Sequence, residues 1–80
     1  MEAEIEYQFM SFIDRRASKY LGACVVKAKD ITEGINQAYK KGINPGGEVA
    51  AFGLTEDHFQ SQGLELNRLY SKAEMDALGF

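Results

Sequence analysis

The clearest periodic pattern of apolar and polar positions lies in the middle of the chain. There, apolar side chains recur at intervals of about one helical turn, which places them on one side of a helix. Asp30 precedes this stripe and is suited to cap it, because its carboxylate can accept from the free N–H groups of the first turn. The pattern therefore predicts a helix over residues 31–41. Its apolar stripe consists of Ile31, Ile35, Ala38 and Tyr39.

The residues around this helix predict how it packs and ends. Gly34 lies on the apolar side and would allow a close approach to a sheet. Gly42 follows the last turn at a position that favours a left-handed backbone, and Ile43 can fold back onto Ala38. The next four residues, Asn44, Pro45, Gly46 and Gly47, predict a rigid turn, since proline fixes φ and glycine accepts a positive φ.

Three further stretches have the composition of strands. Residues 4–13 fit either a strand or a helical stripe, and their content of Ile, Tyr and Phe favours the strand. Residues 20–29 predict a second strand with Cys24 on one face and lysines on the other. The short polar loop between the two predicts an antiparallel hairpin. Residues 48–54 predict the third strand.

The last third of the chain carries weaker signals. Thr55 can cap a short turn through residues 56–58, and residues 60–63 resemble a loop. Ser71 and Glu74 have the spacing of a capping box, which predicts a short helix over residues 72–78. A helix of this length is stable only when it packs against the rest of the domain.

Together these elements predict a single α+β domain over residues 1–80. The expected order is β-β-α-β-(α), with a sheet of about three strands and one main helix packed on one face. A chain of 80 residues has room for one hydrophobic core.

Charge is distributed unevenly along the chain, whose net charge is −3. Residues 1–14 carry four acids and no base, residues 15–41 carry seven bases and two acids, and residues 42–80 carry six acids and two bases. These contributions of −4, +5 and −4 sum to the net charge. The basic segment either pairs with acids inside the folded domain or forms a binding face.

The residue types needed for catalysis are few. The chain has one cysteine and one histidine, and Cys24 lies in an apolar strand, where a thiol is usually an inert core group. Glu56, Asp57 and His58 are neighbours without the spacing of metal ligands. The glycines after the main helix stand at the wrong end of it for a phosphate loop. We therefore expect neither an enzyme nor a bound cofactor or metal.

Binding of a partner is the remaining class of function. Four tyrosines and five phenylalanines are many for so small a core, and a small sheet has edges that need cover. These features predict a homodimer, with contacts at a sheet edge or at two loops. The loop residues are Arg15, Arg16, Lys19, Asn44, Pro45, Gly46 and Gly47.

A nucleic-acid-binding module is the alternative, because the basic segment 15–29 has aromatic residues close to it. The acidic N-terminus is unlike a signal peptide, no apolar run could span a membrane, and a lone cysteine fits a reducing compartment. We therefore expect a small cytoplasmic interaction or accessory protein. Residues 25–47 resemble a strand–helix–turn module common in small bacterial and phage proteins, and this resemblance implies no functional residues.

Overall fold

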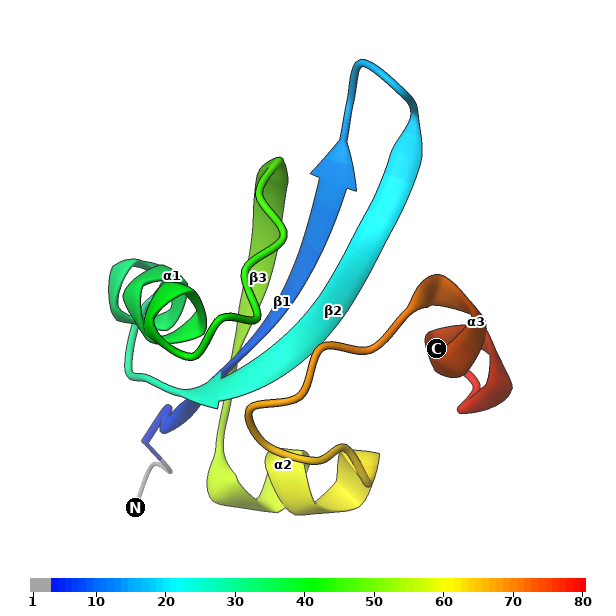
Figure 1. Ribbon diagram of the computed structural model, residues 1–80. Helices are drawn as coiled ribbons and strands as arrows, with labels where there is room; N and C mark the ends of the chain where they lie inside the picture. Colours follow the sequence, from blue (N-terminus) through cyan, green and yellow to red (C-terminus); the bar gives the residue numbers. More distant parts are fainter. Residues whose placement is uncertain (1–3) are drawn as a thin grey trace.

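The computed structural model describes residues 4–80 and has three strands and three helices (Figure 1). The sheet is antiparallel with the strand order β2-β1-β3. These strands and helices confirm the predicted single α+β domain, and the structure has one helix more than predicted. The elements in chain order are β1 (Tyr7–Asp14), β2 (Lys19–Lys27), α1 (Ile31–Lys40), β3 (Glu48–Leu54), α2 (Glu56–Gln62) and α3 (Lys72–Ala77).

Strand β1 occupies the centre of the sheet and pairs with both other strands. It forms the predicted hairpin with β2, in a register that places Met10 opposite Cys24. Its other side pairs with β3, where Phe9 lies opposite Phe52. The first segment is therefore a strand, which resolves the ambiguity of residues 4–13 from Tyr7 onward. Because β2 and β3 each run antiparallel to β1, they are parallel to one another with β1 between them.

Helix α1 begins and ends as its sequence predicts. The side chain of Asp30 accepts from the N–H of Glu33 at 2.8 Å. At the other end, Gly42 N–H donates to Tyr39 C=O at 3.1 Å and Ile43 N–H donates to Ala38 C=O at 3.0 Å. These two bonds form a Schellman motif, which satisfies carbonyl groups that the helix end would otherwise leave free.

One face of the sheet packs against α1. Ala38 is fully buried there, and a Cβ atom at Gly34 would lie 3.2 Å from Cβ of Gln8, so the helix approaches β1 closely. The predicted apolar stripe is partly wrong, because Ile31 and Tyr39 are 43% and 78% exposed. Three strands are too narrow to cover the whole stripe, so the small residues face the sheet. The buried residues of this cluster are Met10, Phe12, Cys24, Val26, Ala28 and Ala38.

The opposite face is partly covered by α2, α3 and the loop between them. In α2, Phe59 stacks on Tyr7 of β1 with ring centroids 4.2 Å apart. This contact explains why a helix extends through residues 60–62, where a loop is predicted from the polar composition. The buried residues of this second cluster are Tyr7, Ala23, Val25, Leu54, Leu64, Tyr70 and Met75.

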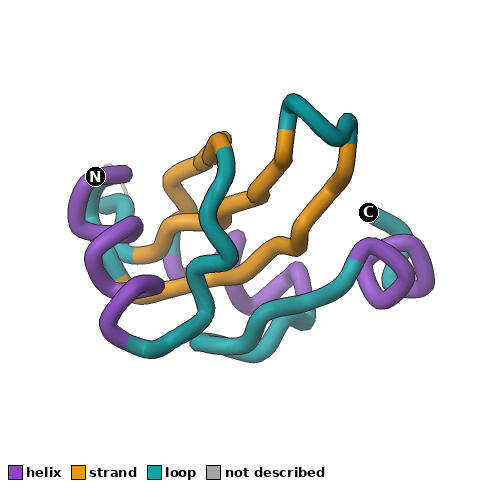
Figure 2. Tube along the Cα trace, turned by 45° about the horizontal axis from the view of Figure 1, so that its top comes forward, coloured by secondary structure: helices purple, strands orange, loops and turns teal. Residues whose placement is uncertain are grey.

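The loop between α2 and α3 runs along the outer edge of β2 (Figure 2). Ala23 and Tyr70 exchange two main-chain hydrogen bonds of 2.9 and 2.7 Å, and Asn67 N–H donates to Val25 C=O at 2.8 Å. Ser71 and Glu74 then form the predicted capping box of α3. Hydrogen bonding from the Ser71 N–H lowers the pKa of the Glu74 carboxyl. None of the helices in residues 4–80 has the length and hydrophobicity that a membrane span needs.

Burial of Cys24 makes its reactivity a test of the core. Burial raises the pKa of this thiol to about 11, so the reactive thiolate is scarce near neutral pH. We predict that a thiol reagent such as Ellman's reagent modifies Cys24 only after denaturation. The variant Ser61→Cys is the matched control, because residue 61 is exposed and its new thiol should react at once. Rapid modification of Cys24 in the native wild-type protein would contradict this packing.

Candidate functional site

The outer edge of β3 is the first candidate site, and the hydrogen-bond pattern of β1 defines it. Ala23 and Val25 of β2 bond outward to the loop before α3, so the residues that alternate with them, such as Cys24, bond toward β1. Because Met10 lies opposite Cys24, the even-numbered residues of β1 bond toward β2. In an antiparallel sheet, the odd-numbered residues of β1 then form their main-chain hydrogen bonds with β3. Phe9 and Phe52 are therefore a hydrogen-bonded pair. The N–H and C=O groups that point away from the sheet therefore belong to Val49, Ala51 and Gly53.

The two outer edges of the sheet differ in their cover. The outward groups of β2 bond to the loop between α2 and α3, as described for Ala23 and Val25. Within residues 4–80, no main-chain hydrogen bond reaches the outward groups of Val49, Ala51 or Gly53. The outer edge of β3 can therefore accept another strand.

The composition of β3 does little to block such pairing. Natural edge strands are often protected by proline, by bulges or by charged side chains. Strand β3 has no proline, and its pairing with β1 continues without a register shift. Its one charged residue is Glu48 at the first position, and this carboxylate forms an ion pair with Arg15 of the same chain.

An exposed row of aromatic side chains lies beside this edge. Phe52 of β3 is 64% exposed and Phe80 is 49% exposed. The ring of Phe9 on β1 lies between them, with its centroid 6.3 Å from that of Phe52 and 6.0 Å from that of Phe80. We call Phe9, Phe52 and Phe80 the aromatic row. It begins at the open edge and crosses the face that α2 and α3 leave partly uncovered.

The structure brings the two predicted binding loops together at one end of the sheet. Arg15 and Arg16 lie in the turn after β1, and Lys19 begins β2. The carbonyl oxygen of Ile13 would lie 2.6 Å from a Cβ atom at Gly47, so the loop before β3 lies against the end of β1.

Within this second loop, Gly46 has the predicted positive φ, but no main-chain hydrogen bond between residues 44 and 47 closes the turn. Gly46 has φ of 87°, and its N–H donates to the side-chain oxygen of Asn44 at 2.8 Å. Pro45 separates these two residues and fixes the entry to the turn. The loop is therefore held in one shape beside the hairpin.

The basic segment, by contrast, is divided between two ends of the sheet. Lys19 and Lys27 are the first and last residues of β2, so about 26 Å of strand separates them. Lys29 also lies near an acid, since its Nζ is 3.9 Å from a carboxylate oxygen of Glu4. The structure thus does not gather the lysines and arginines of residues 15–29 on one surface.

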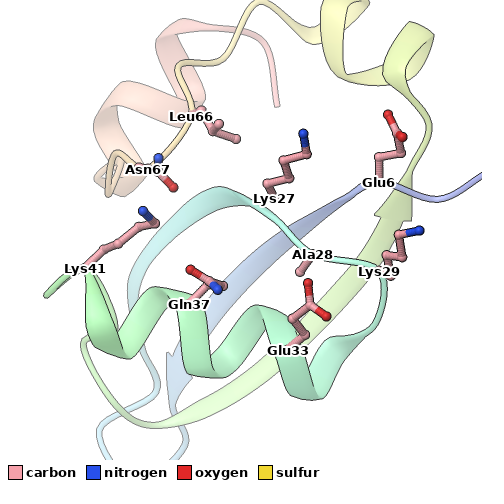
Figure 3. Close-up of a pocket in the computed structure, with 9 residues that line it drawn as sticks. All are labelled: Glu6, Lys27, Ala28, Lys29, Glu33, Gln37, Lys41, Leu66 and Asn67. Carbon is pink, nitrogen blue, oxygen red and sulfur yellow. The ribbon is translucent and has the colours of Figure 1, made fainter.

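A shallow groove between α1, the end of β2 and the loop before α3 is the second candidate (Figure 3). Its volume is about 470 Å³. Gln37 and Glu33 of α1 line one wall, and Lys27 projects from the other side (Figure 3). The three lysines and two glutamates in this groove do not match a single charged ligand, and all of them except the half-buried Glu6 are exposed. The lining residues are Glu6, Lys27, Ala28, Lys29, Glu33, Gln37, Lys41, Leu66 and Asn67.

Cys24 and His58 lie on opposite sides of the sheet. Cys24 belongs to the cluster under α1, whereas His58 is exposed on α2, whose Phe59 packs against the other face. The thiol and the imidazole therefore cannot act on one substrate atom. In the described part of the chain, no three side chains of His, Cys, Asp or Glu gather in a way that could hold a metal ion.

Comparisons of this chain with protein-family models, with curated proteins and with solved structures find no match. Function is therefore inferred from the surface of the molecule itself. Of the surfaces described, the edge of β3 with the aromatic row is the one where unbonded main-chain groups and exposed apolar side chains coincide. Residues 49–53 are thus the functional candidates that the sequence did not single out.

Two adjacent glycines provide a test of how the predicted binding loop is held. Both have a positive φ, of 87° at Gly46 and 77° at Gly47. A Cβ atom at Gly46 would meet nothing within 4 Å, whereas one at Gly47 would collide with the backbone of Ile13. We predict that Gly46→Ala lowers the free energy of unfolding by about 1–2 kcal/mol, from backbone strain alone.

Gly47→Ala should cost about 2–5 kcal/mol, because the collision adds to the same strain. Urea denaturation of the two variants measures the difference. Equal losses of stability would mean that the loop does not lie against the end of β1.

Proposed function

We propose that this protein is a small cytoplasmic interaction or accessory protein that binds another polypeptide by strand addition at β3. It acts by binding rather than by catalysis. The observation that carries this proposal is the open edge of β3, whose outward groups at Val49, Ala51 and Gly53 have no partner in the described chain. Main-chain hydrogen bonds to such an edge give affinity, and pockets for alternate side chains give specificity.

The aromatic row supports the same proposal. A strand added beside β3 would extend the sheet, and its side chains on one face would lie next to Phe52. Burying an exposed phenylalanine ring contributes about 1.5–3 kcal/mol, which is large compared with a typical net main-chain hydrogen bond of about 1 kcal/mol. Edge and ring together therefore favour an extended, apolar peptide segment as the ligand.

Selection of peptides from a displayed random library tests this function directly. We predict that selected peptides are extended, with apolar residues at alternate positions, and that their binding perturbs the NMR signals of residues 49–53. The variant Ala51→Pro should lose this binding, since it removes an outward N–H without touching the bonds between β3 and β1. Phe52→Lys should weaken it as well, and Ala73→Lys on the exposed surface of α3 is the control for the added charge.

Two results would contradict the proposal. One is a selection that yields peptides binding Ala51→Pro and Phe52→Lys as tightly as the parent. The other is binding of a labelled single-stranded oligonucleotide that disappears with salt and in the double variant Arg15→Ala/Arg16→Ala. The second result would favour the nucleic-acid alternative.

A further inference from the structure

We propose that the partner of the β3 edge is a second copy of this chain, paired antiparallel about a two-fold axis at Ala51. The two sheets would then join into one continuous sheet of six strands. This inference rests on the proposed function, because it names the partner for the same edge. Hydrogen bonding, side-chain size and charge at the edge all favour this occupant.

The hydrogen-bonding groups of β3 match those of a second β3 in one register. Pairing Ala51 with Ala51 of the second copy places Val49 opposite Gly53, and Gly53 opposite Val49. All of these residues present their N–H and C=O groups outward, so each of the three pairs can exchange two hydrogen bonds. If the second strand were shifted by one residue, the outward groups of one strand would face residues whose groups point inward, toward β1. If it were shifted by two residues, one of the three outward residues on each strand would have no partner. The two-fold register is therefore the one that satisfies the whole edge.

Side chains in this register are complementary in size. On the face of the aromatic row, Phe52 would lie opposite Ala50 of the second copy, which leaves room for the ring. The two Phe52 side chains would be diagonal neighbours, at the roughly 7–8 Å over which aromatic side chains still reach one another. The aromatic row, which ends at Phe52 in one copy, would thus continue through Phe9 and Phe80 of the other. On the other face, Val49 would lie beside Gly53 without crowding.

The surroundings of the two ends of β3 also differ in charge. Near its first residue, the bases Arg15, Arg16 and Lys19 outnumber the acids Asp14 and Glu48 by one, and Glu48 is paired with Arg15. The last residue of β3 leads into a shallow acidic hollow lined by Glu4, Glu6, Thr55, Glu56 and Asp57. An antiparallel pair places the weakly basic end of each copy near the acidic end of the other, whereas a parallel pair would oppose like charges. Between these ends, residues 49–54 of β3 carry no charged side chain, so pairing along the edge brings no like charges into direct opposition.

Light scattering coupled to size-exclusion chromatography over a micromolar dilution series tests the dimer. The expected result is a mass that rises toward twice 8.9 kDa with concentration. Phe52→Lys should raise the dimer dissociation constant by about 30-fold or more, as loss of a buried aromatic contact does. Ala51→Pro should act in the same direction, and Ala73→Lys should leave the dissociation constant unchanged. Circular dichroism checks that each variant is folded.

Disulfide formation tests the register. In Ala51→Cys the two new thiols would stand in a bonded pair with Cα atoms about 5.5 Å apart, within the range that a disulfide spans. Oxidation should therefore link the chains covalently. Ala50→Cys is the matched control, because residue 50 would face residue 52 of the second copy. The two Cα atoms at position 50 would then be farther apart than the roughly 7 Å that a disulfide can span. The buried native Cys24 is present in both variants.

A constant monomer mass, a dimer that tolerates both edge variants, or cross-linking through residue 50 rather than 51 would each overturn the inference. These failures are distinguishable from a failure of the proposed function. A monomer that still binds selected peptides at residues 49–53 would keep strand addition as the function and assign the edge to a different polypeptide. A monomer that binds no peptide would end both.

Discussion

Strand β1 pairs with a neighbour on each side, and the arrangement of the other elements follows from this pairing. Its main chain bonds to β2 on one side and to β3 on the other, so both remaining strands become edges. Its side chains alternate between the two hydrophobic clusters, with Met10 and Phe12 under α1 and Tyr7 under α2. Because a one-residue slip would exchange the two faces, this strand fixes the register of the whole sheet.

The two edges of the sheet, β2 and β3, differ in how far the rest of the chain covers them. The chain returns after α2 to bond along β2, and the aromatic side chain of Tyr70 anchors that return in the core. Nothing in residues 4–80 returns in this way along β3. An unprotected edge is a template for another strand, so a protein that keeps one free either uses it or risks uncontrolled association. The exposed Phe52 lies beside this edge, and the specific partner strand that we propose would cover both.

Local chemistry explains which parts of the fold could be predicted. The signals that begin and end a helix act within a few residues, so the sequence alone indicated α1 and α3. These signals are the Asp30 cap, the glycine after α1 and the Ser71 capping box. Strand β3 was predicted with its observed ends. Helix α2 was only partly predicted, since its polar residues have no helical stripe and the helix depends on Phe59 meeting Tyr7. The exposure of Tyr39 was also missed, because the width of the sheet is a tertiary property.

The candidate functional surface, too, could be predicted only in part. The need for cover at a sheet edge was predictable from the size of the domain, but the identity of the edge was not. Whether β1 or β3 lies outside follows from long-range pairing, and so does the alignment of Phe9, Phe52 and Phe80. The loops around Arg15 and Gly47 were chosen from composition, and the structure places them at the end of the edge rather than along it.

Amide hydrogen exchange along β3, followed by NMR at increasing protein concentration, tests whether a partner strand adds at this edge. At high dilution we expect slow exchange at Ala50, Phe52 and Leu54, which bond to β1. Exchange at Val49, Ala51 and Gly53 should then be fast. At high concentration the second set should become protected as well, as a partner strand accepts their hydrogen bonds. Protection of Val49, Ala51 and Gly53 at the highest dilution would show that the edge is already covered within the chain. Fast exchange of these amides at every concentration, with or without bound peptide, would show that no strand adds there.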